Sequence, residues 1–107
     1  MIQKEFYPVG TIVSLFNAKE RLMISGYYQK NNQSDKVWDY VGVLYPNGFL
    51  TPNRMVLFDH EQIESKYYLG CQNTEQMSFI SSLNNKNSKE EDVLWIYRSY
   101  LLDLWLL

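Results

Sequence analysis

His60 is the only histidine in this chain of 107 residues, and it lies between two carboxylates, Asp59 and Glu61. These residue types could bind a metal ion or act as a general base. A metal site needs three or four converging ligands, however, and the side chains of adjacent residues diverge. Asp59 and Gln62 have the spacing of a capping box, in which the first residue begins a helical turn. We therefore interpret Asp59 and His60 as structural residues and predict no metal site.

Two other residues could carry chemistry, Asp39 and Cys71. Asp39 lies inside an apolar segment, where a buried carboxylate needs a partner. We expect it to bond a loop backbone or to emerge at a sheet edge, with a catalytic role as the alternative. Cys71 is the only cysteine, and a lone cysteine most often packs as a small buried apolar residue. Since no converging constellation is visible, we predict no catalytic residues, no cofactor and no enzymatic activity.

The composition is that of a folded domain with no broad affinity for nucleic acid. The chain is 46% hydrophobic and 16% aromatic, and it fits one domain, residues 1–107. Ten basic and twelve acidic residues give a net charge of -2, and the basic residues are scattered. A nucleic-acid surface would need a clustered basic face. A single cysteine suits a reducing compartment, and no apolar run is long enough to span a bilayer. We expect a cytoplasmic protein.

The first two thirds of the chain, residues 6–70, predict a bent antiparallel sheet. Five segments have the β-branched, aromatic or alternating pattern of strands, at residues 11–16, 21–29, 37–45, 55–58 and 65–70. Gly26 and Gly42 interrupt the two longest strands, which predicts sharp bends or bulges there. Short bent strands joined by hairpins favour a small, partly open SH3-like barrel, and a flat meander is the alternative.

Two helices are predicted after the strands, which makes the fold class α+β. Asn73 and Gln76 form a capping box for a helix over residues 73–84, with Met77, Ile80 and Leu83 on one face. A second box at Ser88 begins a helix over residues 89–106.

This last predicted helix is apolar around most of its circumference. Leu94, Tyr97, Leu101 and Leu104 form one stripe that an ordinary covering helix would bury. Five larger side chains fall outside it, and we predict that they contact a second copy of the chain or another protein: Trp95, Tyr100, Leu102, Trp105 and Leu106. Deep insertion of this helix into its own domain is the alternative.

Aromatic residues also gather on the predicted strands. Adjacent residues of a strand point to opposite faces, so at least one of the pair Tyr27 and Tyr28 should lie outside the core. Tyr and Trp are favoured at protein interfaces. We therefore add Tyr27, Trp38 and Tyr40 to the predicted partner-binding residues, while ordinary core packing remains the alternative.

Several segments in order resemble one family. The most specific are Asp39–Tyr40–Val41–Gly42 and Phe58–Asp59–His60–Glu61–Gln62–Ile63, and they are accompanied by Tyr7–Pro8–Val9–Gly10 and Tyr68–Leu69–Gly70. This series, over about residues 6–83, resembles the domain of unknown function family 4176 of Gram-positive bacteria. Members are often encoded beside type VII secretion effectors that carry an LXG domain. The resemblance implies an accessory role, an adaptor or chaperone for such an effector, and it implies no catalytic residues.

Three hypotheses follow. The first is a non-catalytic, cytoplasmic protein-binding accessory whose partner is an LXG-type effector. The second is a small nucleic-acid-binding or nucleotide-binding barrel that uses exposed aromatic residues. The third is an enzyme that uses Asp39 or His60. Net acidity disfavours the second hypothesis, and the missing constellation disfavours the third.

Overall fold

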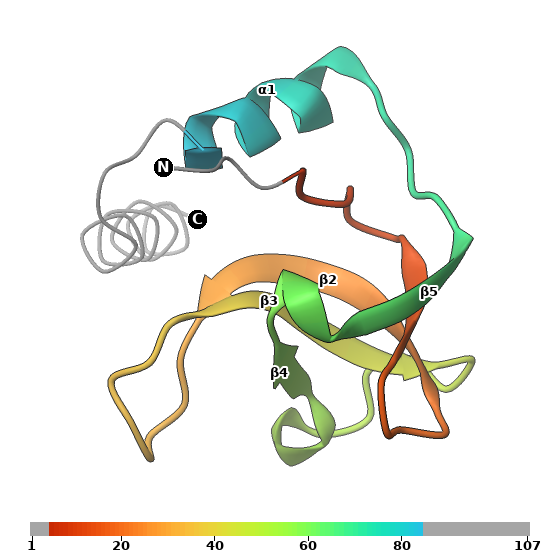
Figure 1. The fold of residues 1–107 in the computed structure, drawn as a ribbon, viewed down its shortest axis with the longest axis vertical. Helices are drawn as coiled ribbons and strands as arrows, with labels where there is room; N and C mark the ends of the chain where they lie inside the picture. Colours follow the sequence, from red (N-terminus) through yellow and green to blue (C-terminus); the bar gives the residue numbers. More distant parts are fainter. Residues whose placement is uncertain (1–4, 85–107) are drawn as a thin grey trace, which may run out of the picture.

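The computed structural model describes residues 5–84 and shows a five-stranded antiparallel sheet followed by one helix (Figure 1). The strand order is β4-β3-β2-β1-β5, so that β4 and β5 form the two edges of an open sheet. The elements are β1 (Ile12–Leu15), β2 (Arg21–Gln29), β3 (Trp38–Tyr45), η1 (Pro52–Arg54), β4 (Val56–Phe58), η2 (His60–Gln62), β5 (Ile63–Tyr68) and α1 (Thr74–Asn84).

The predicted class and element order are confirmed for the described residues. Strands appear in each of the five predicted segments, and the turn predicted after Asp59 is the 3-10 helix η2. The short helix η1, which begins at Pro52, was not predicted. The second helix predicted over residues 89–106 lies outside the described residues, as do Trp95, Tyr100, Leu102, Trp105 and Leu106.

The predicted alternation of Tyr27 and Tyr28 is wrong, because the backbone of β2 is irregular at two points. The register of β2 against β3 shifts between Ile24 and Gly26, and Tyr28 has a left-handed backbone with a φ of 50°. Both tyrosines are consequently 7% exposed. The ring of Phe6 meets both of them edge to face, at 5.7 and 5.5 Å between ring centroids. A single ring can touch both because the left-handed backbone of Tyr28 breaks the alternation of a regular strand.

The other interior glycine, Gly42, permits a close approach and does not mark a bulge. A Cβ atom there would lie 3.1 Å from the backbone oxygen of Met23 and 3.1 Å from the ring of Phe58. Phe58 is fully buried and stacks on Tyr40 at 5.2 Å between centroids. The glycine therefore lets β4 deliver this ring into the core.

Helix α1 lies over one side of the sheet and is attached to it through few residues (Figure 1). Asn73 caps the helix as predicted, since its Oδ1 accepts the N–H of Gln76 at 2.9 Å. Ile80 and Leu83 are buried, but Met77, predicted on the same face, is 40% exposed. At the far end, the hydroxyl of Tyr28 donates to the carbonyl oxygen of Leu83 at 3.3 Å.

The segment before β1 crosses the residues that follow β5 at Gly70, which is buried. A Cβ atom at this position would collide with the carbonyl oxygen of Val9 and lie 3.0 Å from the nitrogen of Thr11. The Gly70 N–H also donates to the hydroxyl of Thr11 at 3.0 Å, and Thr11 is fully buried. Only glycine therefore allows the end of β5 to pass beneath the segment that enters β1.

We expect Gly70→Ala to lower the free energy of unfolding by about 1–3 kcal/mol, the usual cost of forcing a group into packed atoms. Urea denaturation of both proteins measures this change. Ser78→Ala, an exposed change on α1, is the control and should leave the midpoint within error. Equal stability of Gly70→Ala and the original protein would contradict the crowding at this crossing.

Candidate functional site

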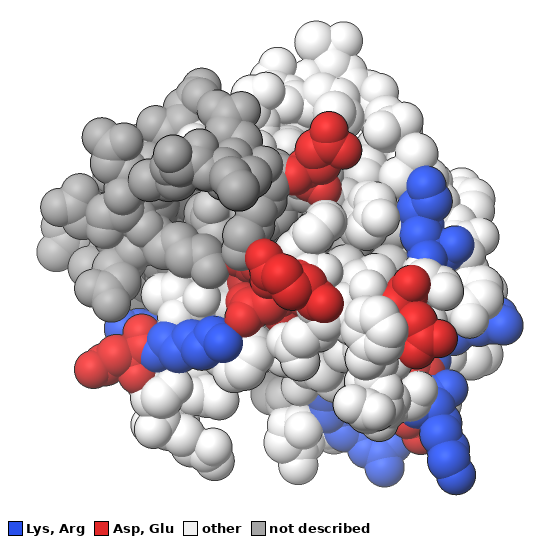
Figure 2. Space-filling view, viewed as in Figure 1, with Lys and Arg blue, Asp and Glu red and all other residues white. Residues whose placement is uncertain are grey.

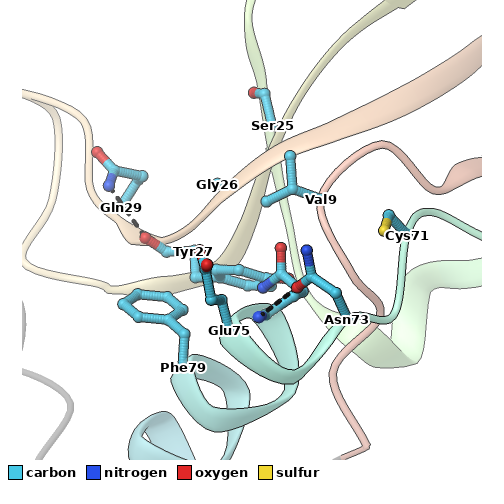
Figure 3. Close-up of a pocket in the computed structure, with 10 residues that line it drawn as sticks. Val9, Ser25, Gly26, Tyr27, Gln29, Cys71, Asn73, Glu75 and Phe79 are labelled. Atoms are coloured by element: carbon cyan, nitrogen blue, oxygen red, sulfur yellow. Dashed lines mark hydrogen bonds between the residues drawn. The ribbon is translucent and has the colours of Figure 1, made fainter.

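A groove opens between β2 and the beginning of α1, with a volume of about 570 Å³ (Figure 3). Its sides come from three parts of the chain: the segment before β1, the bulged part of β2, and the turn that leads into α1. The lining residues are Val9, Ser25, Gly26, Tyr27, Gln29, Cys71, Asn73, Glu75, Gln76 and Phe79.

The floor of the groove is apolar and rigidly held. Phe79 lies 5.9 Å from Tyr27 between ring centroids, and Figure 3 shows the two rings side by side. The Tyr27 hydroxyl donates to the carbonyl oxygen of Tyr7, which fixes the ring from below. Val9 and Phe79 are 42% and 41% exposed. The groove therefore presents apolar side chains to solvent above a buried aromatic ring.

The rim of the groove is polar and nearly neutral. Among residues 5–84, Glu75 is the only charged residue that lines it. Two amide side chains are held in place: Gln29 donates to the Tyr27 carbonyl at 3.0 Å, and Asn73 caps α1. An apolar floor with a few fixed polar groups is the usual composition of a binding pocket.

Cys71 is exposed on this rim, so the prediction that it is a buried apolar residue is wrong. It lies on the irregular turn between β5 and α1. Figure 3 shows it apart from Tyr27 and Phe79, and the lining residues include no histidine that could activate a thiol. The groove thus offers contacts for binding and no nucleophile with a base beside it.

The other residues considered for chemistry meet in a separate polar cluster between β3 and η2. Asp39 is fully buried, and its Oδ2 accepts the backbone N–H of His60 at 3.0 Å. The Asp39 N–H in turn donates to Oδ1 of Asp59 at 3.1 Å. As expected, the carboxylate of Asp39 binds a loop backbone. Because it binds the backbone of His60 and not the imidazole, it is not placed to orient that ring for proton transfer.

The imidazole of His60 has a fixed partner, since Tyr40 Oη lies 2.7 Å from its Nδ1. The Tyr40 oxygen also accepts the N–H of Tyr7 at 3.0 Å, so one hydroxyl connects the imidazole to the N-terminal segment. Burial raises the pKa of the Tyr40 phenol well above its usual range, so the phenol keeps its proton.

Asp59 joins this cluster to the surface. It forms a capping box with Gln62, as predicted, and the Gln62 amide oxygen accepts the Asp59 N–H at 2.8 Å. Its Oδ2 lies 2.8 Å from Nζ of Lys36, which also lies over the ring of Trp38 at 3.9 Å from the centroid. One carboxylate thus connects η2, β3 and the loop before β3.

One family model matches the chain, over residues 6–79, and it is described as Domain of unknown function (DUF4176). The chain belongs to this family. The match spans more than half of the chain and includes every residue that lines the groove, as well as the Asp39–His60 cluster. No curated protein and no solved structure matches. The family resemblance seen in the sequence is therefore confirmed, and the groove is part of the DUF4176 region.

The partner-binding residues predicted on the strands are mostly internal. Tyr40 is fully buried in the aromatic core, so the prediction that it is available to a partner is wrong. Tyr27 is 7% exposed and reaches the surface only as the floor of the groove. Trp38 is half-buried. Val9 and Phe79 were not predicted as binding residues. For Phe79 the available signal was its position next to the apolar stripe of Met77, Ile80 and Leu83.

Neither a metal site nor a membrane span is found in residues 5–84. That part of the chain contains no group of three or more histidine, cysteine, aspartate or glutamate residues that could hold a metal ion. Its helices are too short and too polar to cross a bilayer.

Asp59→Ala should lower the melting temperature, because it removes the capping box and the acceptor for the Asp39 N–H together. The loss of a helix cap typically costs about 0.5–2 kcal/mol. Thermal unfolding followed by circular dichroism measures the shift, with the exposed Glu64→Ala as control. A transition metal bound at His60 in the purified protein would contradict the structural interpretation of this cluster.

Alkaline pH should destabilise the fold through Tyr27 and Tyr40. Burial raises the pKa of both phenols in the folded state above the ordinary value of about 10. Both states bind these protons at neutral pH, whereas the unfolded chain releases them first as the pH rises. The free energy of unfolding should therefore fall above about pH 10. Urea titrations at several pH values measure this slope, which should flatten in Tyr27→Phe/Tyr40→Phe. An unchanged slope in that variant would rule out these two groups as the cause.

Proposed function

We propose that this DUF4176 protein is a non-catalytic accessory that binds another protein through the groove between β2 and α1. The supporting observation is the groove itself, in which exposed Val9 and Phe79 lie above the fixed ring of Tyr27 inside a nearly neutral rim. Its volume is sufficient for one or two apolar side chains of a partner. Exposed apolar groups gathered in a concave site mark an interaction surface.

The family resemblance suggests the kind of partner. An adaptor or chaperone in the cytoplasm would hold the LXG region of a type VII secretion effector until export. The residues predicted on the last helix, Trp95 to Leu106, would extend the same surface or form a homodimer. This part of the proposal rests on the resemblance and on the apolar sequence of residues 89–106.

We also propose the finer fold description, a partly open SH3-like barrel. The first strand of the sheet pairs with the last, and η2 joins the two edge strands β4 and β5. A sheet whose edges are connected by one short turn is already curved toward closure.

Phe79→Asp should lower recovery of the partner at least tenfold, because it places a charge on the apolar floor and the buried charge would lack a partner. The experiment is co-expression of the tagged protein with the LXG region of a type VII secretion effector from the same organism, followed by affinity purification. Phe49→Asp is the matched control, because Phe49 is 60% exposed and does not line the groove. Equal recovery with Phe79→Asp and with the original protein would exclude the groove as the binding site.

One observation favours the nucleic-acid hypothesis as a second candidate. The guanidinium of Arg21 lies 4.1 Å from the centroid of the Tyr67 ring, and Tyr67 is 53% exposed. Exposed aromatic and basic groups together can stack on bases. On the face shown in Figure 2, however, the Lys and Arg side chains are interspersed with Asp and Glu. Fluorescence anisotropy with a labelled oligonucleotide at low salt separates the two hypotheses.

A further inference from the structure

A second groove, of about 770 Å³, lies between the β2–β3 loop and η1. Figure 1 shows both of these segments projecting from the sheet on the side away from α1. The lining residues are Gln29, Lys30, Asn31, Asn32, Gln33, Trp38, Val41, Pro52, Asn53, Met55 and Leu57. Gln29 lines both grooves, and the other residues of this groove are separate from the first.

The two walls differ from the floor in chemistry. Val41 and Leu57 are register partners on β3 and β4, and with Met55 they give the floor an aliphatic surface. The walls carry five amide side chains, and Lys30 is the only charged residue that lines the groove in the described part of the chain. A ligand that fits this groove is therefore uncharged, with apolar side chains and backbone-like polar groups.

The β2–β3 loop is held in shape by two short side-chain contacts. Asn31 Oδ1 accepts the N–H of Gln33 at 3.0 Å, and the Ser34 hydroxyl accepts the N–H of Lys36 at 3.3 Å. Turns of this kind limit the conformations of a loop before any ligand arrives. The wall is consequently ordered in advance, which reduces the entropy lost on binding.

Trp38 supplies a hydrogen-bond donor without an acceptor. Its indole Nε1 is buried and has no partner among the described residues. A buried donor left unpaired is unfavourable, and such groups in folded proteins usually have a functional or structural reason. Trp38 lines the groove, so a small movement of its ring would offer this N–H to a carbonyl oxygen of a ligand.

These features together define the ligand. We propose that this groove binds an uncharged peptide segment in the polyproline II conformation. Such a segment has no internal hydrogen bonds, so its carbonyl oxygens are open to donors such as the Trp38 N–H. Pairing as an extra strand is disfavoured, because the edge strand here, β4, is only three residues long. The apolar side chains of the segment would rest on Val41, Met55 and Leu57.

A carbohydrate is the competing ligand for a site with a tryptophan and several amides. One face of the Trp38 ring is already covered by Lys36 Nζ, 3.9 Å from the centroid, and Asp59 holds that lysine in place. The floor is aliphatic. Both observations reduce the area available for stacking a sugar ring, and they favour the peptide.

The test uses the full chain and a decapeptide made only of proline and leucine, with both ends blocked. Isothermal titration calorimetry measures its affinity, and NMR follows the indole N–H signal of Trp38. We expect this signal to move on binding. Trp38→Phe should weaken the affinity about tenfold, the loss of one hydrogen bond to the ligand. Its urea midpoint is measured beside the affinity, so that a loss of binding is distinguished from a loss of folding.

Two controls keep this result separate from the first groove. Phe79→Asp should bind the decapeptide with unchanged affinity, so failure of the proposed function would not affect this proposal. A peptide with glutamate in place of leucine should bind at least tenfold more weakly, because the floor is apolar. The proposal is overturned if the proline–leucine peptide does not bind at millimolar concentration, if Trp38→Phe binds it equally well, or if cellotetraose shifts the Trp38 signal in its place.

Discussion

The irregular backbone of β2 is the constraint on which the aromatic core depends. The register against β3 shifts between Ile24 and Gly26, and the left-handed backbone of Tyr28 then breaks the alternation between Tyr27 and Tyr28. Both rings are therefore buried and meet Phe6, which fixes the N-terminal segment across the sheet. In a regular strand, the two tyrosines would point to opposite faces and Phe6 would lose one of these contacts.

The same irregular backbone places the two tyrosines where they contact α1. Tyr28 bonds the carbonyl oxygen of Leu83 near the end of the helix, while Tyr27 faces Phe79 near its middle. Few other residues of α1 are buried, so the helix is attached along a narrow line and a groove remains beside it. The candidate binding site is thus a direct consequence of how these aromatic rings are directed.

On the opposite side of β3, a buried carboxylate has an equivalent organising role. The Asp39 carboxylate accepts a hydrogen bond from the backbone N–H of His60, and the Asp59 carboxylate accepts one from the backbone N–H of Asp39. This exchange connects η2 to the central strand and positions the Tyr40–His60 pair over the core. Through Lys36, Asp59 also covers one face of Trp38, so the polar cluster shapes the second groove. Burial of the Asp39 carboxylate is offset in part by the hydrogen bond that it accepts from the His60 N–H.

The amino-acid sequence by itself determined the local structure of the described residues. Strand periodicity located β1 to β5, and the caps at Asp59 and Asn73 located η2 and α1, because these signals depend on neighbours within a few residues. The sequence also determined the family, because the segments that carry the resemblance, Asp39–Gly42 and Phe58–Ile63, are contiguous motifs within the matched region.

Only the tertiary structure decided which side chains are accessible. The exposure of Val9, Cys71 and Phe79 and the burial of Tyr40 depend on contacts between segments far apart in the sequence. The bulge in β2 was suggested by Gly26, but the burial of both Tyr27 and Tyr28 also required the left-handed backbone at Tyr28. A bulge exchanges the faces of the residues beyond it, and Gly26 does not by itself say which residue is the extra one. The two grooves, on which both proposals rest, therefore depend on tertiary packing that no local sequence pattern specifies.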